Sequence, residues 1–240
     1  MYDLAIIGGM GPEATAALFS RIVSRTLAAS DQEHMTICVL SDARIPDRTA
    51  FLLGKGPDPL PRIMENIARA RAAGCKHFVI PCNTAHHFAD AYAAVEGITF
   101  INMVDAACAL AKRTHPGKPV MVLGTHGTVQ ANVYGRAKEA AGLDIRYPSP
   151  AAQERVMAMI TAVKGGMYDA AALARELVSM LESASSNEEL VYILACTELS
   201  LLTPALQEMR PARFLDALDA AADSAILACG YRVRVSTHGV

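Results

Sequence analysis

The sequence predicts an α/β fold of two similar lobes, each a mostly parallel sheet flanked by helices. Two observations predict this class. Short apolar runs alternate with longer segments of helical periodicity along the chain, as in parallel α/β proteins. Two motifs also recur in the same order at nearly the same separation, which indicates an internal repeat. We expect the lobes to be related by a pseudo-twofold axis, with a functional site in the cleft between them.

The first half of the chain predicts four strands, at residues 4–7, 35–40, 77–80 and 98–101. The first strand ends in Gly8 and Gly9, and Pro12 then opens a helix that runs to about Leu27. A second helix runs from Pro61 to Gly74, and a third covers residues 84–95. Residues 41–60 contain five prolines and glycines, so we expect a long irregular loop there.

The second half repeats this order. Strands are expected at residues 120–123, 143–146 and 190–194, and helices at 129–140, twice within 151–184, and at 216–228. We therefore divide the chain into a first lobe of residues 1–104 plus 212–240 and a second lobe of residues 105–211.

The composition limits the possible functions. The 240 residues are 52% hydrophobic and 19% charged, with a net charge of −2, and the basic residues are scattered, so neither nucleic acid nor membrane binding is expected. No apolar run is long enough to span a membrane, and residues 1–4 do not resemble a signal peptide. The six cysteines are accordingly expected to be free thiols of a cytoplasmic protein.

The repeat contains a glycine turn and a cysteine turn. The segment LAIIGGMG at residues 4–11 resembles VMVLGTHG at 120–127, which begins 116 residues later. The segment FVIPCNT at 78–84 resembles YILACTE at 192–198, which begins 114 residues later. Ligands of parallel sheets bind beyond the carboxyl ends of the strands, so we expect Cys82 and Cys196 to lie on opposing walls of one cleft.

Both of these cysteines follow a strand and precede a helix, where the helix N-terminus lowers a thiol pKa and favours the thiolate. Polar residues follow each of them, whereas the other four cysteines are expected to be packed thiols. Two opposed thiols suit racemisation. One thiolate can remove a Cα proton from one face while the other thiol returns a proton to the opposite face.

Three other readings compete with this one. The first alternative is a zinc site, because cysteine and histidine bind zinc and four such residues are candidates: Cys82, His86, His87 and Cys196. Their spacing is not that of a zinc site, and no metal is expected. Residues 9–14 fit the G-x-G-x-x-A fingerprint of an NAD-dependent enzyme, but Asp42 lies farther along than the usual ribose-binding acid. A glycine turn before a helix also binds carboxylates, so a non-catalytic dicarboxylate-binding protein is the third alternative.

With these residues in hand, the chain resembles the aspartate/glutamate racemase family, and within it aspartate racemases most. The resemblance rests on five motifs in order, at residues 7–15, 45–49, 81–86, 127–128 and 196–199. It implies a two-cysteine racemase that is independent of pyridoxal phosphate and of any other cofactor, and a homodimer. The expected substrate is an acidic amino acid, aspartate first and glutamate second.

The resemblance also implies roles for further residues. Glu198 would assist Cys196 in proton transfer. The α-carboxylate and amino groups of the substrate would be held by Asn83, Thr84, Thr125, Thr128 and Thr197 and by the backbone near Met10. Arg48 in the long loop and Lys164 in the second lobe would bind the substrate carboxylates.

Overall fold

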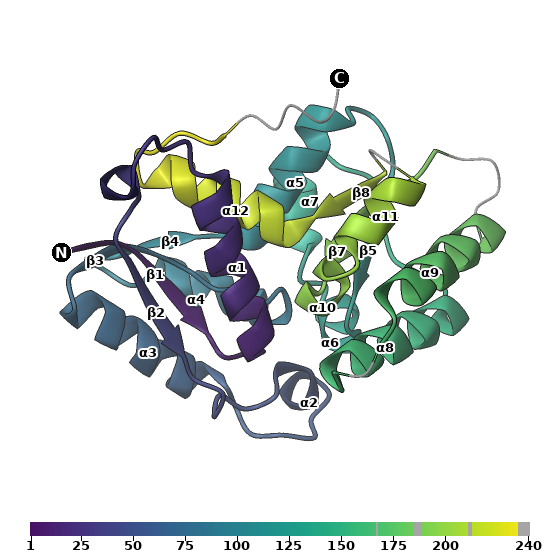
Figure 1. Cartoon of the computed structure of the whole chain (residues 1–240). Coiled ribbons are helices and arrows are strands. Elements are labelled where there is room, and N and C mark those ends of the chain that lie inside the picture. The colour runs from purple at the N-terminus through teal and green to yellow at the C-terminus, as the bar shows by residue number, and fades with distance from the viewer. Residues whose placement is uncertain (167, 185–188, 211–212, 235–240) are drawn as a thin grey trace.

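The computed structural model describes residues 1–166, 168–184, 189–210 and 213–234, and the chain forms two four-stranded sheets (Figure 1). The first sheet contains, in spatial order, β2 (Ile37–Ser41), β1 (Tyr2–Gly8), β3 (Cys75–Val79) and β4 (Thr99–Ile101). The second contains β6 (Ile145–Arg146), β5 (Val120–Gly124), β7 (Val191–Ala195) and β8 (Phe214–Asp216). All six pairings are parallel. The same strand order in both sheets confirms the predicted fold of two similar α/β lobes.

Helices connect the strands, as parallel pairing requires. In the first half they are α1 (Pro12–Arg25), the 3-10 turn η1 (Asp31–Glu33), α2 (Arg48–Leu52), α3 (Leu60–Ala72), the 3-10 helix η2 (Thr84–Phe88), α4 (Ala89–Ala93) and α5 (Met103–Thr114). In the second half they are α6 (His126–Gln130), α7 (Gly135–Ala141), α8 (Pro150–Lys164), α9 (Ala170–Ala184), α10 (Thr197–Ser200), α11 (Thr203–Met209) and α12 (Ala217–Ala228).

The two lobes share one hydrophobic core. Along β1, Leu4 and Ile6 face this shared core, whereas Ala5 and Ile7 face the side covered by α3. The shared core also contains residues of β5 and β7 and the inner faces of α1, α5 and α12. Helix α12 lies between the two sheets in Figure 1 and packs against α1 and α5. The lobes are therefore fixed relative to each other by continuous apolar packing.

Several elements differ from the sequence prediction. The loop expected at residues 41–60 contains the helix α2, which begins because the Asp47 carboxylate accepts the Ala50 N–H at 2.6 Å. The single helix expected at 129–140 is divided into α6 and α7, with Asn132 in a left-handed conformation (φ 47°) between them. The helix expected at 84–95 begins as the 3-10 segment η2. Helices α5 and α11 and strand β8 were not anticipated, whereas α10 is the helix expected directly after Cys196.

The lobe boundaries remain a prediction, and the boundary between residues 211 and 212 lies outside the described residues. One segment does not follow the expected division, because β8 pairs with β7 of the second sheet although it was assigned to the first lobe. Within the described ranges, no helix combines the length and the apolar character needed to cross a membrane.

Candidate active site

The two cysteines of the repeat lie beyond the carboxyl ends of equivalent strands. Cys82 comes shortly after β3, and Cys196 directly follows β7 as the N-cap residue of α10. Both are buried, and both line one inner cavity of about 20 Å³. The shared topology therefore brings together two thiols that are 114 residues apart in sequence.

The glycine turn after β1 contributes Met10 to the wall of this cavity. Gly9 has φ 91°, and a Cβ there would lie 2.3 Å from the backbone of Asp42, so only glycine fits. The carbonyl of the next residue, Met10, accepts a hydrogen bond of 2.9 Å from Nη2 of Arg48. Nη1 of Arg48 donates to the Pro46 carbonyl at 2.8 Å. Arg48 thus ties the turn after β1 to the start of α2.

One nitrogen of the Arg48 guanidinium has no partner among the described residues. The side chain is buried, and its Nε atom has no hydrogen-bond partner among the described residues. Arg48 lines both the inner cavity and a larger outer cavity. A buried guanidinium with an unpaired N–H is suited to binding a carboxylate oxygen.

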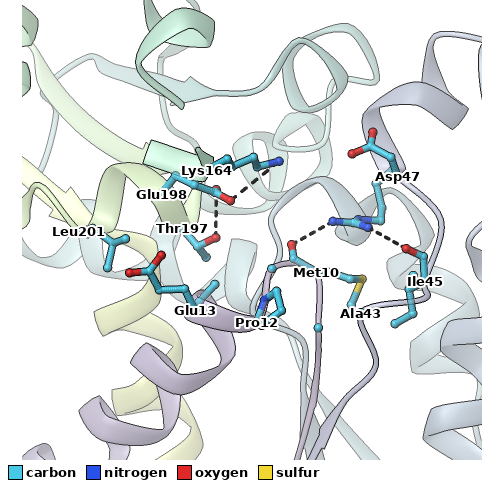
Figure 2. Close-up of a pocket in the computed structure, with 14 residues that line it drawn as sticks. Met10, Pro12, Glu13, Ala43, Ile45, Asp47, Lys164, Thr197, Glu198 and Leu201 are labelled. Atoms are coloured by element: carbon cyan, nitrogen blue, oxygen red, sulfur yellow. Dashed lines mark hydrogen bonds and ion pairs between the residues drawn. The ribbon is translucent and has the colours of Figure 1, made fainter. Parts of the chain in front are cut away.

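The Cys196 thiol is held by a carboxylate. Its Sγ atom donates to Oε2 of Glu198 at 2.9 Å, and the Thr197 hydroxyl donates to the same oxygen at 3.3 Å. The ammonium of Lys164 lies 3.8 Å from Oε1 of Glu198. Figure 2 shows Lys164, Thr197 and Glu198 together on one wall of the outer cavity, opposite Met10, Ile45 and Asp47.

This environment corrects one expectation for Cys196. We expected the helix N-terminus to lower its pKa, but burial, followed by the negative charge of Glu198, raises the pKa of the Cys196 thiol well above its ordinary value. Helix α10 has four residues, so its dipole is small compared with the cost of ionising a buried thiol beside a carboxylate. Cys196 is therefore a protonated thiol at neutral pH.

Cys82 is supported differently, through its backbone. Nδ1 of His86 donates to the Cys82 carbonyl at 2.9 Å, and Nε2 of the same ring accepts the Met103 N–H at 3.1 Å. Burial lowers the pKa of His86 to about 4, so this imidazole is neutral and its tautomer is fixed. The neighbouring His87 is exposed. The neutral ring holds Cys82 in place without adding charge.

Threonine hydroxyls join the two lobes behind the cysteines. Oγ1 of Thr84 lies 3.0 Å from Oγ1 of Thr125 and 2.9 Å from Oγ1 of Thr128, and Thr49 donates to Thr125 at 3.3 Å. Gly127 allows this approach, because a Cβ there would come within 3.0 Å of the Thr49 and Thr84 side chains. The lobes therefore meet through polar groups that can also serve a ligand.

The outer cavity has a volume of about 380 Å³ and adjoins the inner one. Six residues line both cavities: Met10, Asp47, Arg48, Lys164, Thr197 and Glu198. The two cysteines line only the inner cavity. A small molecule would thus enter from the outer cavity and reach the thiols past these six side chains.

The sequence anticipated most of the inner wall. Ten of the eleven residues that we selected line the inner cavity, and they come from both lobes: Met10, Arg48, Cys82, Asn83, Thr84, Thr125, Lys164, Cys196, Thr197 and Glu198. Thr128 lies behind the wall, where its hydroxyl contacts Thr84 and Thr125. Asp47, Thr49 and Ala195 also line the cavity and were not selected, although each adjoins a selected residue in sequence.

Two alternatives lose support from the geometry. The carboxylate of Asp42, considered as a ribose ligand, instead accepts hydrogen bonds from Nε of Arg62 at 2.6 Å and Nδ2 of Asn66 at 3.1 Å. These bonds hold the pKa of Asp42 well below its usual range, and the bond from Arg62 contributes most. In the described part of the chain, no three His, Cys, Asp or Glu side chains are grouped as metal ligands. His86 in particular uses both ring nitrogens on the backbone.

Comparisons with known proteins show the family of the chain. Residues 7–225 match the family model described as Asp/Glu/Hydantoin racemase. The broad specificity amino-acid racemase RacX of Bacillus subtilis (strain 168) is 24% identical over 217 residues, which cover 87% of this chain and 90% of that protein.

Solved structures also resemble the chain. The aspartate racemase of Picrophilus torridus is 28% identical, with a TM-score of 0.81 over 97% of this chain and 96% of that one. The glutamate racemase of Thermus thermophilus, solved with β-chloro-D-alanine, shares the fold with a TM-score of 0.65 and 21% identity, over 95% of this chain and 80% of that one.

Proposed function

The chain belongs to the Asp/Glu/hydantoin racemase family, and we propose that it interconverts the enantiomers of an acidic amino acid by proton transfer between Cys82 and Cys196, without a cofactor. Its family makes it an isomerase of the amino-acid racemase type. We propose aspartate as the first substrate and glutamate as the second. The observation that carries the proposal is that both thiols line one inner cavity, together with polar residues of both lobes.

The proton transfers balance without an external acid or base. The Cys82 thiolate takes the Cα proton from one face of the substrate, which leaves a carbanion stabilised by the adjacent carboxylate. The Cys196 thiol then donates its proton to the opposite face and becomes a thiolate. The opposite enantiomer reacts with the two roles exchanged. The raised pKa of Cys196 supports this starting state, in which Cys196 is the acid.

Polar groups of the cavity suit the rest of the substrate. We propose that the Asn83 amide and the hydroxyls of Thr84, Thr125 and Thr197 hold the α-carboxylate and the amino group. The unpaired Nε of Arg48 and the ammonium of Lys164 supply positive charge for the carboxylates. Thr128 supports the hydroxyls of Thr84 and Thr125 from behind.

The inner cavity must widen to admit an amino acid. About 20 Å³ is the space that one water molecule needs, and an amino acid is several times larger. We therefore propose that side chains between the two cavities move when substrate enters. Expulsion of water on reclosure would strengthen the interactions between the substrate and the charged groups.

The test is incorporation of deuterium from solvent. Enantiopure aspartate and glutamate are incubated with reduced, folded protein in deuterated water without added cofactor. We expect optical rotation to be lost while deuterium enters Cα. A folded protein that exchanges no amino acid would refute the racemase proposal, and activity that requires NAD would revive the dinucleotide alternative. The homodimer and the cytoplasmic location expected from the sequence remain predictions.

A further inference from the structure

In the side-chain amide of Asn83, the oxygen has a hydrogen-bond partner and the nitrogen has none among the described residues. Asn83 is buried and lines the inner cavity beside Cys82. Its Oδ1 atom accepts a hydrogen bond of 2.7 Å from the hydroxyl of Tyr134. Its Nδ2 atom is buried and has no hydrogen-bond partner within the described residues. An unpaired buried amide nitrogen is costly, which indicates that this atom serves a ligand.

Tyr134 reaches this amide from the other lobe. It lies in the turn between α6 and α7, at the N-cap of α7, and is fully buried in the shared core. Burial raises the pKa of Tyr134 well above its ordinary value, so the hydroxyl keeps its proton and donates it. Rotation of the amide by half a turn would leave that buried O–H without an acceptor, so the bond selects one orientation of Asn83.

We propose that Tyr134 is a positioning residue for racemisation, which fixes the Asn83 amide so that its N–H groups face the substrate carboxylate. The proposal rests on the function proposed above and adds a residue outside the cavity wall. Because Tyr134 belongs to the second lobe and Asn83 to the first, the amide is aligned only when the lobes are packed together. Substrate recognition by the first lobe thus depends on a hydroxyl supplied by the second.

The first variant is Tyr134→Phe, which keeps the ring and removes the donor. Oδ1 of Asn83 then faces an apolar ring, so the amide turns its oxygen toward the cavity, where it repels a carboxylate. We expect KM to rise about tenfold, the size expected for a lost hydrogen bond to a charged group, while kcat changes by less than about twofold. The matched control is Tyr92→Phe, since Tyr92 is also fully buried and donates to a backbone carbonyl, that of Ala85, at 3.0 Å. It should leave KM unchanged.

A double-mutant cycle separates positioning from general destabilisation. If Tyr134 acts through Asn83, then Tyr134→Phe added to Asn83→Ala raises KM by less than about twofold further. A merely structural role would give the same factor in both backgrounds. Asn83→Asp supplies a second test that leaves the tyrosine bond possible, because the carboxylate still accepts from Tyr134 but offers no N–H. It should raise KM by at least about tenfold.

The outcomes distinguish this inference from the proposed function. A wild-type protein without racemase activity would refute the proposed function itself. An active wild type with an unchanged KM in Tyr134→Phe would overturn the positioning role alone. If Tyr134→Phe does not fold, Asn83→Asp decides, because a wild-type KM in that variant would show that the substrate does not use the amide N–H groups. Thermal melting of each variant records its folding independently of activity.

Discussion

Two half-sites occupy equivalent positions in sheets of the same strand order, but different chemistry supports them. The Cys82 half-site (Cys82 and His86) is held by a neutral, buried imidazole that binds the backbone. The Cys196 half-site (Cys196, Glu198 and Lys164) is held by a carboxylate that accepts the thiol proton itself, with an ammonium 3.8 Å beyond. The repeated fold thus places two thiols alike while the local residues make them electrostatically unequal.

This difference bears on how a pair of thiols works. An acid and a base must hold different protonation states before each turnover, and two identical sites would have no preference. Burial, followed by the carboxylate of Glu198, keeps the Cys196 thiol protonated, and in the proposed scheme that thiol is the acid. At equilibrium the two enantiomers are equally populated, so kcat/KM must be the same in both directions. The electrostatic difference between Cys82 and Cys196 will therefore appear in variants of the two half-sites and in the reactivity of the two thiols.

The largest expected effect comes from removing either thiol. Cys82→Ser and Cys196→Ser should each lower kcat by about 1,000-fold or more, because a hydroxyl is a much poorer acid–base group near neutral pH. Each variant should keep slow Cα–deuterium exchange with one enantiomer only, and with opposite enantiomers in the two variants. Polarimetry and NMR in deuterated water measure both quantities.

The control for this pair is Cys38→Ser on the edge strand β2, which should retain wild-type kcat. Full activity in either Cys82→Ser or Cys196→Ser would refute the two-base scheme. Exchange of the same enantiomer by both variants would show that the thiols do not face opposite sides of the substrate.

The second effect concerns stability and is confined to the Cys82 half-site. His86 has a folded-state pKa of about 4, below the value of about 6.5 for an unfolded histidine. Stability is therefore intact above about pH 6.5 and is lost as the pH falls from there toward 4, by about 3 kcal/mol in total. Denaturant unfolding between pH 7 and pH 4.5 measures this loss.

The neighbouring histidine provides the control. His86→Gln cannot titrate in this range, so its unfolding free energy should be lower at pH 7 but fall less steeply toward pH 4.5. His87→Gln removes an exposed imidazole and should keep the wild-type acid profile. Equal acid profiles for wild type and His86→Gln would mean that the loss comes from other groups.

The sequence was sufficient to predict the internal repeat and most of the residues that line the inner cavity. Glycine and cysteine turns that recur at nearly equal separations predict equivalent strand ends, because a duplicated α/β unit repeats its topology. Helix α5 could also have been predicted. Asn102 caps it, and its buried residues Val104, Ala107, Cys108 and Ala111 follow helical spacing.

Other features have no local signal. Strand β8 has three residues, which are too few to show the alternation of apolar and polar side chains that predicts a strand. The bond from Tyr134 to Asn83 spans 51 positions, and the pair becomes visible only when the lobes are packed together. The raised pKa of Cys196 could not be read from the strand-to-helix pattern either. Desolvation depends on burial in the folded protein and here exceeds the effect of the helix terminus.

A smaller kinetic effect is expected from the carboxylate of the Cys196 half-site. Glu198→Gln keeps the shape but removes the charge that orients the thiol and strengthens it as a base, so kcat should fall about tenfold. Glu154→Gln makes the same change of charge at an exposed position on α8 and should have no effect. Wild-type kcat in Glu198→Gln would show that proton transfer by Cys196 does not depend on the carboxylate.

The smallest expected effect is a change in the rate at which Cys196 is alkylated. It is also the most direct measure of the electrostatic difference between the two half-sites. Iodoacetamide is uncharged and reacts with thiolates, so its rate at fixed pH reports the ionised fraction of each cysteine. Because Glu198 contributes to the raised pKa of Cys196, Glu198→Gln should increase the labelling of Cys196 several-fold at pH 8, as measured by peptide mass spectrometry. Cys108 is the internal reference, since burial in the shared core raises its pKa to about 12, away from Glu198. An unchanged Cys196 rate would mean that burial alone keeps the thiol protonated, and the two half-sites would then differ in how they are held but not in the charge that acts on the thiol.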